Sequence, residues 1–340
     1  MAPAGAVPVM AWGHDFLAEW SPTDLAASTV ARARRLGLDI VKLQPRASCF
    51  AEAFGSGYGP SGTALEGPRL GHWPIDGIEA WSNLPEVDAS HPSLADQVDA
   101  LARVVESLGD ERPVLQTIFS PFTVASYVAA DDRAESSRKR PDLIAKDQSR
   151  AVRHLRARPE ILERALARIS VTLIDFLRRS LDAGAGGIFF AVGGSASADA
   201  LAQSEYEELV LPHDLAVLDA VPADVPVVLH LCGPRLNFGL TAALRSDAVS
   251  WATTEAGNPG LAEGRDLSGR VAIGGVPEVS VLAEGSPEDV RGAVRAAIDE
   301  TEGRGVVIGP GCSIPPATPR ENLLAMVDTA HGVPPARSRS

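Results

Sequence analysis

Short β-branched runs alternate with longer amphipathic stretches along the whole chain, and this order of elements constrains the fold more than any other feature. Eight of the short runs predict strands. They span Val7–Trp12, Ile40–Gln44, Pro113–Phe119, Gly187–Val192, Val225–Leu231, Ala248–Ala252, Val271–Val276 and Gly305–Ile308. The amphipathic stretches predict helices at Pro22–Leu36, Leu94–Leu108, Arg158–Asp182, Ser204–Ala220, Arg235–Arg245, Pro259–Leu267, Pro287–Glu302 and Pro319–His331. Strands that alternate with helices indicate parallel strands joined by helical crossovers.

Eight strand-and-helix units predict a single closed (β/α)₈ TIM barrel with long loops at its C-terminal face. The 340 residues suit this fold, which needs about 250 residues and often carries insertions. The alternative is an open doubly wound sheet, which usually carries a glycine-rich phosphate-binding motif after its first strand. In this chain GHDFLAEW follows the first predicted strand instead. We expect the barrel to span residues 1–332, with 333–340 as a disordered tail. Two long loops, 45–93 and 131–158, interrupt the alternation, and we expect the charged second one to be a solvated surface helix or an oligomer edge.

Composition excludes several classes of protein. The formal net charge of −13, without a basic stripe, argues against binding to nucleic acid. Three cysteines in so long a chain do not form a secreted disulfide framework. The N-terminus lacks the pattern of a signal peptide, and no run of 18 apolar residues occurs. We therefore expect a cytoplasmic protein that does not enter the membrane.

Two of the three cysteines lie in a pattern that suits a metal ion. His230 and Cys232 stand two residues apart at the end of a predicted strand, so their side chains leave the same face. Cys312 follows the last predicted strand, and in a barrel both segments reach the catalytic rim. Imidazole and two thiolates are ligands that Zn²⁺ prefers, and three ligands with one open position are typical of catalytic zinc. The competing interpretation is a core histidine beside buried thiols, as we expect for Cys49.

Other polar residues at strand ends extend this predicted site. Three of them are expected to face the substrate: His14, Gln44 and Gln116. Glu255, after the sixth strand, is the preferred fourth zinc ligand, which an incoming substrate would displace, and Glu278 is the reserve. For each of these residues, a hydrogen bond to a loop is the competing explanation.

Several segments resemble the uroporphyrinogen decarboxylase superfamily. QTIFSPFTVASYV, LDAGAGGIFFAVGG and LVLPHDLAVLDAV match its segments in character and order. VVLHLCG followed by GPGCSIPPATPRENLLAMVDT resembles the zinc signature of its methylcobamide:coenzyme M methyltransferase branch. The arginine motif of the true decarboxylases is missing from MAWGHDFLAEW, and their catalytic aspartate has no clear counterpart in IVKLQPRASCF.

The resemblance implies a zinc-dependent methyltransferase. In this reading His230, Cys232 and Cys312 hold Zn²⁺, and a small thiol accepts a methyl group from a methylated corrinoid that a separate corrinoid-binding protein carries. A decarboxylase of a tetrapyrrole or another polycarboxylate is the main alternative, and it requires a basic pocket. The nearest arginines are Arg46, Arg69 and Arg235. The second alternative is a non-catalytic barrel that binds a corrinoid or tetrapyrrole. The oligomeric state stays open.

Overall fold

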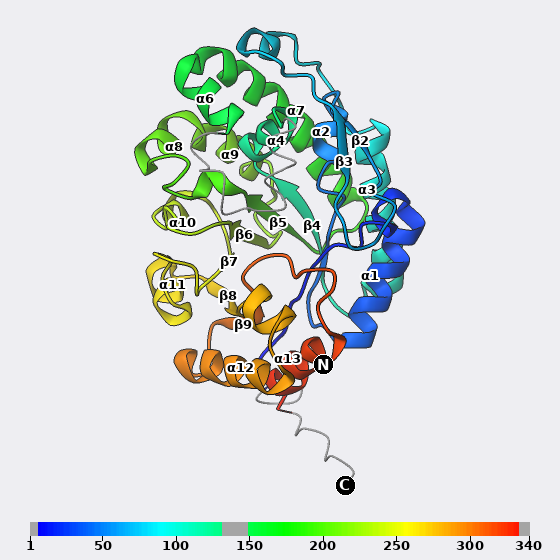
Figure 1. The fold of residues 1–340 in the computed structure, drawn as a ribbon, viewed down its shortest axis with the longest axis vertical. Helices are drawn as coiled ribbons and strands as arrows, with labels where there is room; N and C mark the ends of the chain where they lie inside the picture. Colours follow the sequence, from blue (N-terminus) through cyan, green and yellow to red (C-terminus); the bar gives the residue numbers. More distant parts are fainter. Residues whose placement is uncertain (1–5, 131–148, 333–340) are drawn as a thin grey trace.

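The computed structural model describes residues 6–130 and 149–332, and a curled parallel sheet forms its centre (Figure 1). Within these residues seven strands pair in chain order, each parallel to the next. They are β1 (Val41–Leu43), β4 (Val114–Phe119), β5 (Gly187–Val192), β6 (Val227–Leu231), β7 (Ala248–Ser250), β8 (Val271–Val276) and β9 (Val306–Pro310). All seven lie within or beside the predicted strands, so the fold is α/β with a TIM-barrel-like sheet.

The first predicted strand, Val7–Trp12, is present as a segment that bridges both edges of the sheet. Val9 forms a parallel bridge with Ile308 of β9, and Met10 forms one with Ile40, next to β1. The Met10 N–H donates to the Ile308 carbonyl at 3.0 Å. The segment stays shorter than a regular strand because Pro8 has no N–H to donate, although its carbonyl accepts from the Ile308 N–H.

Helices cover the outside of the sheet (Figure 1). The longer ones lie where the amphipathic stretches predict them: α1 (Pro22–Leu36), α3 (Pro92–Leu108), α7 (Pro159–Asp182), α11 (Leu261–Ser268), α12 (Pro287–Thr301) and α13 (Arg320–Ala330). α1 begins where Ser21 accepts a hydrogen bond from the Asp24 N–H, and it ends at Gly37, whose φ of 73° suits a residue without Cβ. In the described part of the chain, no helix is both long and apolar enough to cross a bilayer.

Two predicted helices differ from the observed ones. The stretch Ser204–Ala220 is split into α8 (Gln203–Leu209) and α9 (Leu211–Leu218), because Pro212 cannot donate to the preceding turn. Within the predicted helix Arg235–Arg245, only α10 (Leu240–Ala243) is helical. The first residue of this stretch, Arg235, has a left-handed backbone conformation with φ 46°.

The two long loops contain structure that the alternation did not predict. Residues 45–93 hold a short hairpin and two helical segments: α2 (Cys49–Ala53), β2 (Gly57–Gly59), β3 (Arg69–His72) and η2 (Ile78–Asn83). In the second loop, residues 131–148 lie outside the described residues, and α6 (Arg150–Ala157) buries one face through Ala151, Val152 and Leu155. The remaining short elements are η1 (Ala18–Trp20), α4 (Pro121–Val128), η4 (Gly194–Ala196) and the π-helical turn η5 (Glu278–Ala283).

Alternate side chains of each strand pack into two different cores. On β4, Leu115 belongs to a cluster inside the sheet with Trp12 and Phe189. Val114 and Ile118 instead pack outward against the helices. Because successive side chains point to opposite faces, the same alternation decides which residues face the interior of the sheet.

Candidate functional site

His230, Cys232 and Cys312 converge at the carboxyl ends of the strands. The Sγ atoms of Cys232 and Cys312 are 3.9 Å apart, and the Sγ of Cys312 is 3.6 Å from Nε2 of His230. One ligand atom from each of the three residues lies within 4.8 Å of the others. Segments separated by 80 residues therefore bring an imidazole and two thiols to a single point.

The spacing of these atoms fits a metal ion better than a disulfide. A disulfide holds its sulfurs about 2.05 Å apart, and all three cysteines of the chain are free. A tetrahedral Zn²⁺ with bonds of about 2.3 Å to sulfur and about 2.0 Å to nitrogen separates two sulfurs by about 3.8 Å and nitrogen from sulfur by about 3.5 Å. The observed separations of 3.9 and 3.6 Å match this arrangement.

The surroundings of His230 hold its ring in one orientation. Nδ1 lies 3.2 Å from the Oγ of Ser250, the residue beside it on β7. The ring stacks on Phe189 at 5.4 Å between centroids and meets the edge of Trp12 at 6.0 Å. A hydroxyl on Nδ1 leaves Nε2 directed toward the sulfurs, as is typical of metal-bound histidines.

The two glutamates that were expected to supply a fourth zinc ligand, Glu255 and Glu278, occupy different positions relative to the three residues. The structure does not bring Glu255 to the three residues, because its side chain is exposed in the turn after β7. Glu278 is not part of the three-residue group either, but its carboxylate approaches the segment of Cys312, where it is 3.0 Å from the position that a Cβ on Gly311 would occupy. The sequence order of strands and loops could not distinguish these two glutamates.

A cavity of about 260 Å³ opens beside the three residues, and all of them line it. His14 and Gln44 also line this cavity, where they were expected. A second, wider cavity of about 670 Å³ shares His14 and Tyr127 with the first and extends to Arg69. His14, Ala47 and Tyr127 line both cavities, so the two cavities are neighbours.

Gln116 does not reach the cavity. Its neighbours on β4, Thr117 and Phe119, line the cavity, whereas Gln116 is fully buried on the face of the strand that packs against the helices. Neither polar atom of its amide has a hydrogen-bond partner among the described residues. Thr117, one residue along the strand, therefore lines the cavity at the position where Gln116 was expected.

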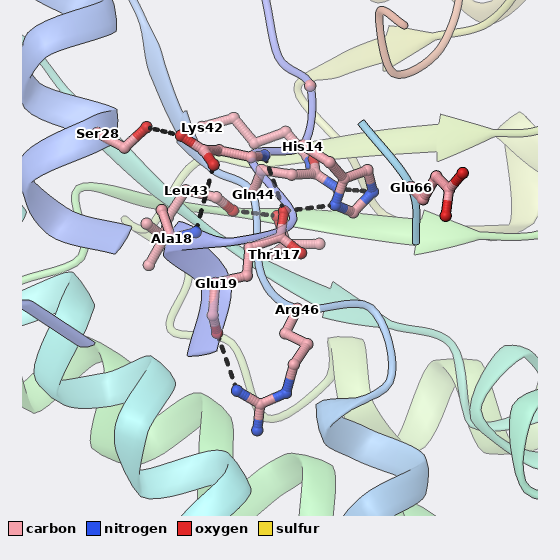
Figure 2. A network of polar contacts seen from close by, with 12 residues as sticks. His14, Ala18, Glu19, Ser28, Lys42, Leu43, Gln44, Arg46, Glu66 and Thr117 are labelled. Carbon is pink, nitrogen blue, oxygen red and sulfur yellow. Dashed lines mark hydrogen bonds and ion pairs between the residues drawn. The ribbon is translucent and has the colours of Figure 1, made fainter. Parts of the chain in front are cut away.

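A chain of hydrogen bonds leads from a buried carboxylate to a lysine that the sequence analysis did not single out (Figure 2). Oε1 of Glu19 lies 2.6 Å from Nδ1 of His14, whose Nε2 lies 2.9 Å from Nε2 of Gln44. Oε1 of Gln44 accepts from Nζ of Lys42. If the Gln44 amide donates to His14, the imidazole carries its proton on Nδ1, toward Glu19.

Lys42 is buried in the interior of the sheet and lines the same cavity as His230 and Cys312. Burial lowers the pKa of Lys42 to about 7, and negative charge on Cys312 or Glu19 opposes that shift. A lysine within an otherwise apolar strand is the signal that could have identified it, since lysine is almost never fully buried without a partner.

The two cysteine environments differ in their electrostatics. The hydrogen bond with Cys232 is the largest of the effects that raise the pKa of Cys312 well above its ordinary value, and burial adds to it. Two adjacent thiols thus resist becoming thiolates together unless a cation is bound between them. Burial also raises the pKa of Cys49, which lies in α2 away from the cavity. Cys49 is the buried structural thiol that its sequence context predicts.

The chain matches the family described as uroporphyrinogen decarboxylase (URO-D) over residues 10–333, which confirms the resemblance in the motifs. A methylcobamide:CoM methyltransferase, MtbA, of Methanosarcina mazei is 24% identical over 296 residues, covering 87% of this chain and 80% of the relative. A uroporphyrinogen decarboxylase of Alkalilimnicola ehrlichii is 30% identical over 278 residues, covering 79% of this chain and 70% of the relative.

Solved structures share the fold. A methyltransferase from Methanosarcina mazei superposes with a TM-score of 0.74 at 21% identity, covering 97% of this chain and 95% of that one. A B12-independent methionine synthase from Shewanella sp. W3-18-1 gives a TM-score of 0.57 at 12% identity, covering 98% and 94%. At these identities the likenesses establish the architecture.

Proposed function

Because the chain belongs to the uroporphyrinogen decarboxylase family and is therefore an enzyme, we propose that it is a zinc-dependent methyltransferase. The acceptor is a small thiol, and the donor is a methylated corrinoid carried by a separate protein. In the proposed reaction the thiol sulfur releases its proton to solvent and gains the methyl group. The corrinoid keeps the electron pair of the carbon–cobalt bond that breaks.

The convergence of His230, Cys232 and Cys312 is the observation that carries this proposal, because the two separations that involve Cys312 fit a tetrahedral zinc ion and all three ligand atoms lie within 4.8 Å of one another. The similarity to a methylcobamide:CoM methyltransferase over 87% of the chain supports the corrinoid donor and the thiol acceptor. The cavity of about 260 Å³ beside the three residues has room for a small acceptor.

Each residue of the site has a distinct task in this proposal. When bound, zinc lowers the pKa of a coordinated thiol so that its sulfur attacks as the thiolate. Cys232 and Cys312 balance the charge of the ion, and His230 supplies the neutral ligand. Ser250 fixes the ring of His230, and Trp12 and Phe189 exclude water from the inner side of the site. Glu278 is better placed than Glu255 as a displaceable fourth ligand.

The decarboxylase alternative receives less support from the cations around the site. Arg46 forms a two-pronged ion pair with Glu52, and exposed Arg235 pairs with Asp199. Arg69 lies on the outer cavity. None of the three lines the cavity of His230, where Lys42 is the single lysine or arginine among the described lining residues, so a porphyrinogen with several carboxylates would meet one cation there. Methyl transfer is therefore the preferred function, although decarboxylases are among the relatives.

Three broader expectations remain part of the proposal. We infer that the segment around Val9 and Met10, paired with both edges of the sheet, acts as the eighth strand of a closed barrel. We also infer a single domain over residues 1–332, and the tail expected at 333–340 lies outside the described residues. The cytoplasmic location follows from the free cysteines and stays a proposal.

Purified protein is expected to bind close to one zinc ion per chain, because three preformed N and S ligands give tight binding. Elemental analysis measures the metal content. Removing zinc with a chelator should abolish methylation of a small thiol by methylcobalamin, and added zinc should restore it. Absence of zinc uptake, or methylation that survives chelation, would contradict the proposed function.

Ser250→Ala is expected to weaken zinc binding about tenfold by releasing the Nδ1 side of His230. Ser246→Ala is the matched control, because the Ser246 hydroxyl is buried near the start of the same strand and has no hydrogen-bond partner among the described residues. Competition with a chromogenic zinc chelator measures both affinities. Equal affinities in the two variants would show that Ser250 does not position the histidine.

A further inference from the structure

Lys42 is the one lysine among the described residues, in a chain whose basic side chains are mostly arginines. The sequence contains 28 arginines and three lysines, and the other two lysines, Lys139 and Lys146, lie outside the described residues. The guanidinium group of arginine keeps its proton in proteins, whereas a buried lysine amine can release its proton. Position 42 therefore carries the basic side chain that can take up a proton and give it back.

The amine of Lys42 lies near the proposed zinc ligands without a hydrogen bond to them. Nζ is 4.7 Å from the ring centroid of Phe189 and 5.8 Å from that of Trp12, and the ring of His230 packs against the same two residues. Within the described residues Nζ makes one hydrogen bond, to Oε1 of Gln44, and none to a sulfur. A small thiol in the cavity of about 260 Å³ can reach both the amine and the proposed ligands, because all of them line this cavity.

A third, much narrower cavity lies between Lys42 and α1. Its volume is about 20 Å³, which is room for one water molecule. Lys42 and Gln44 line both this narrow cavity and the cavity of His230. The half-buried Ser28 and Thr29 of α1 also line the narrow cavity. The narrow cavity therefore joins the surroundings of the amine to partly exposed side chains of α1.

Glu19 supplies the narrow cavity with a carboxylate oxygen that has no partner. Glu19 is 1% exposed and lines this cavity. Its Oε1 lies 2.6 Å from Nδ1 of His14 and accepts from the Asp15 N–H at 3.2 Å. Its Oε2 is buried and has no hydrogen-bond partner among the described residues. Because an unpartnered buried oxygen is energetically costly, this atom favours a hydrogen-bond donor such as water.

Charged groups approach the amine from several elements. The charged, histidine and cysteine side chains that line the two cavities around it are Asp15, Glu19, Arg32, His14, His230, Cys232 and Cys312. Burial is the largest influence on Lys42 and lowers its pKa to about 7, whereas negative charge on Cys312 and Glu19 raises it. An amine that titrates near neutral pH can accept and release a proton within one reaction cycle.

We propose that Lys42 accepts the proton of the acceptor thiol and passes it, through a water molecule in the narrow cavity, to Glu19 and on toward α1. This inference rests on the proposed function for the thiol. The S–H bond breaks as an N–H bond forms, so the thiol becomes a thiolate and the amine becomes an ammonium group. The ammonium gives one proton to the water, and the water gives one to Oε2 of Glu19. Solvent at α1 then receives this proton, which restores the amine and the carboxylate.

The neighbouring side chains hold the two ends of this route in place (Figure 2). Gln44 accepts from Nζ of Lys42, and its amide nitrogen lies 2.9 Å from His14, which in turn contacts Glu19. A methylated corrinoid is too large to enter a cavity of about 260 Å³ and must stay at its mouth. A proton that leaves through the narrow cavity does not need that mouth.

Lys42→Arg keeps the positive charge but cannot take up a proton, so it separates proton transfer from a role of the charge alone. The assay uses methylcobalamin as donor and the uncharged thiol 2-mercaptoethanol as acceptor. The zinc-loaded variant is expected to methylate this thiol about a hundredfold more slowly than wild type at pH 7. Its rate should keep rising with pH as hydroxide replaces the amine, whereas the wild-type rate should level off above the pKa of Lys42. A Lys42→Arg rate equal to that of wild type overturns the proposal.

Lys42→Ala leaves room for a small amine, which makes the missing group replaceable. Propylamine is expected to restore this variant to at least about a tenth of the wild-type rate, in proportion to the concentration of the neutral amine. Propanol has a similar length but is not a base, so it should restore nothing. A loss of rate that propylamine does not relieve assigns Lys42 a structural role and contradicts the proposal.

Glu19→Gln removes the carboxylate with little change in shape. Methylation at pH 7 should slow about tenfold, and the pKa of Lys42 should fall further, because the negative charge of Glu19 raises it. Asp214→Asn is the matched control, since Asp214 is a fully buried carboxyl group on α9 that lines neither cavity. The control should keep the wild-type rate and the same pKa of Lys42. Equal effects of the two substitutions would remove Glu19 from the route.

NMR of zinc-free protein labelled with carbon-13 at the lysine Cε tests the amine without catalysis. The chain has three lysines, and the signal that Lys42→Arg lacks belongs to Lys42. This signal is expected to titrate near pH 7, and at lower pH in Glu19→Gln. A titration near the ordinary lysine value of about 10.4 overturns the proposal. If methylation fails in wild type while both NMR results hold, the methyltransferase proposal falls and the coupling of Lys42 to Glu19 stands. If wild type methylates the thiol and Lys42→Arg matches its rate, the proton route falls alone.

Discussion

Cys312→Ser protein is expected to fold normally and to lose its zinc and its activity together. The hydroxyl of serine stays neutral at pH 7, so the site loses one of its two anionic ligands. We expect zinc affinity to fall by more than about a hundredfold, because losing a direct ligand should cost more than losing a hydrogen bond to a ligand, such as that of Ser250 to His230. Cys312 is only partly buried at the rim, so the melting temperature of metal-free protein should change little.

Cys49→Ala is the control for this substitution. Cys49 is fully buried in α2 and does not line the cavity, so its removal leaves a small void without touching the three proposed ligands. This variant should be less stable but keep stoichiometric zinc and its turnover. Retention of full zinc and turnover by Cys312→Ser would show that the ion lies elsewhere or takes no part in catalysis.

Gly264→Ala and Gly292→Ala are expected to change stability in opposite directions, although both glycines lie within helices. A Cβ on Gly264 of α11 would lie 2.2 Å from Cζ2 of Trp251, which is itself fully buried. The resulting overpacking should lower the free energy of unfolding by about 1–3 kcal/mol. Gly292 of α12 has nothing within 4 Å of the same position, so alanine there should raise the free energy of unfolding by about 0.5–1 kcal/mol. Urea denaturation followed by circular dichroism measures both, and destabilisation by Gly292→Ala would contradict this packing.

The convergence of the three proposed zinc ligands could be predicted because strand period and strand ends are both visible in the sequence. His230 and Cys232 are two residues apart on one strand, and Cys312 follows the last one, so a parallel sheet had to bring them to one rim. The structure places their ligand atoms within 4.8 Å of one another. Choosing between Glu255 and Glu278 required the conformation of two turns, which strand order does not specify.

Gln116 and Lys42 show what the sequence could not supply. The strands are buried on both faces, so their apolar runs give the alternation of side chains but not which face is the interior. In the segment VLQTIF of β4, either Gln116 or Thr117 could face the interior of the sheet. In the structure Thr117 lines the interior cavity. In the segment VKL of β1, the lysine stands between two residues that pack against the helices, and its sequence context does not show that it faces the interior of the sheet. Only the register of neighbouring strands settles these positions.

The bridging segment at Val9 and Met10 links the order of synthesis to the order of folding. Val9 pairs with Ile308, and the Val7 N–H donates to the carbonyl of Ala330. The N-terminal segment therefore cannot complete its pairing until nearly the whole chain has been synthesised. Until the ribosome has released residue 308, both edges of the growing sheet lack their final neighbour. Contacts this distant along the chain slow folding, and open strand edges invite aggregation. Pairing of the Val9 segment with β9 is therefore expected to come late in synthesis, and a deletion at either end of the paired region is expected to expose the opposite edge of the sheet.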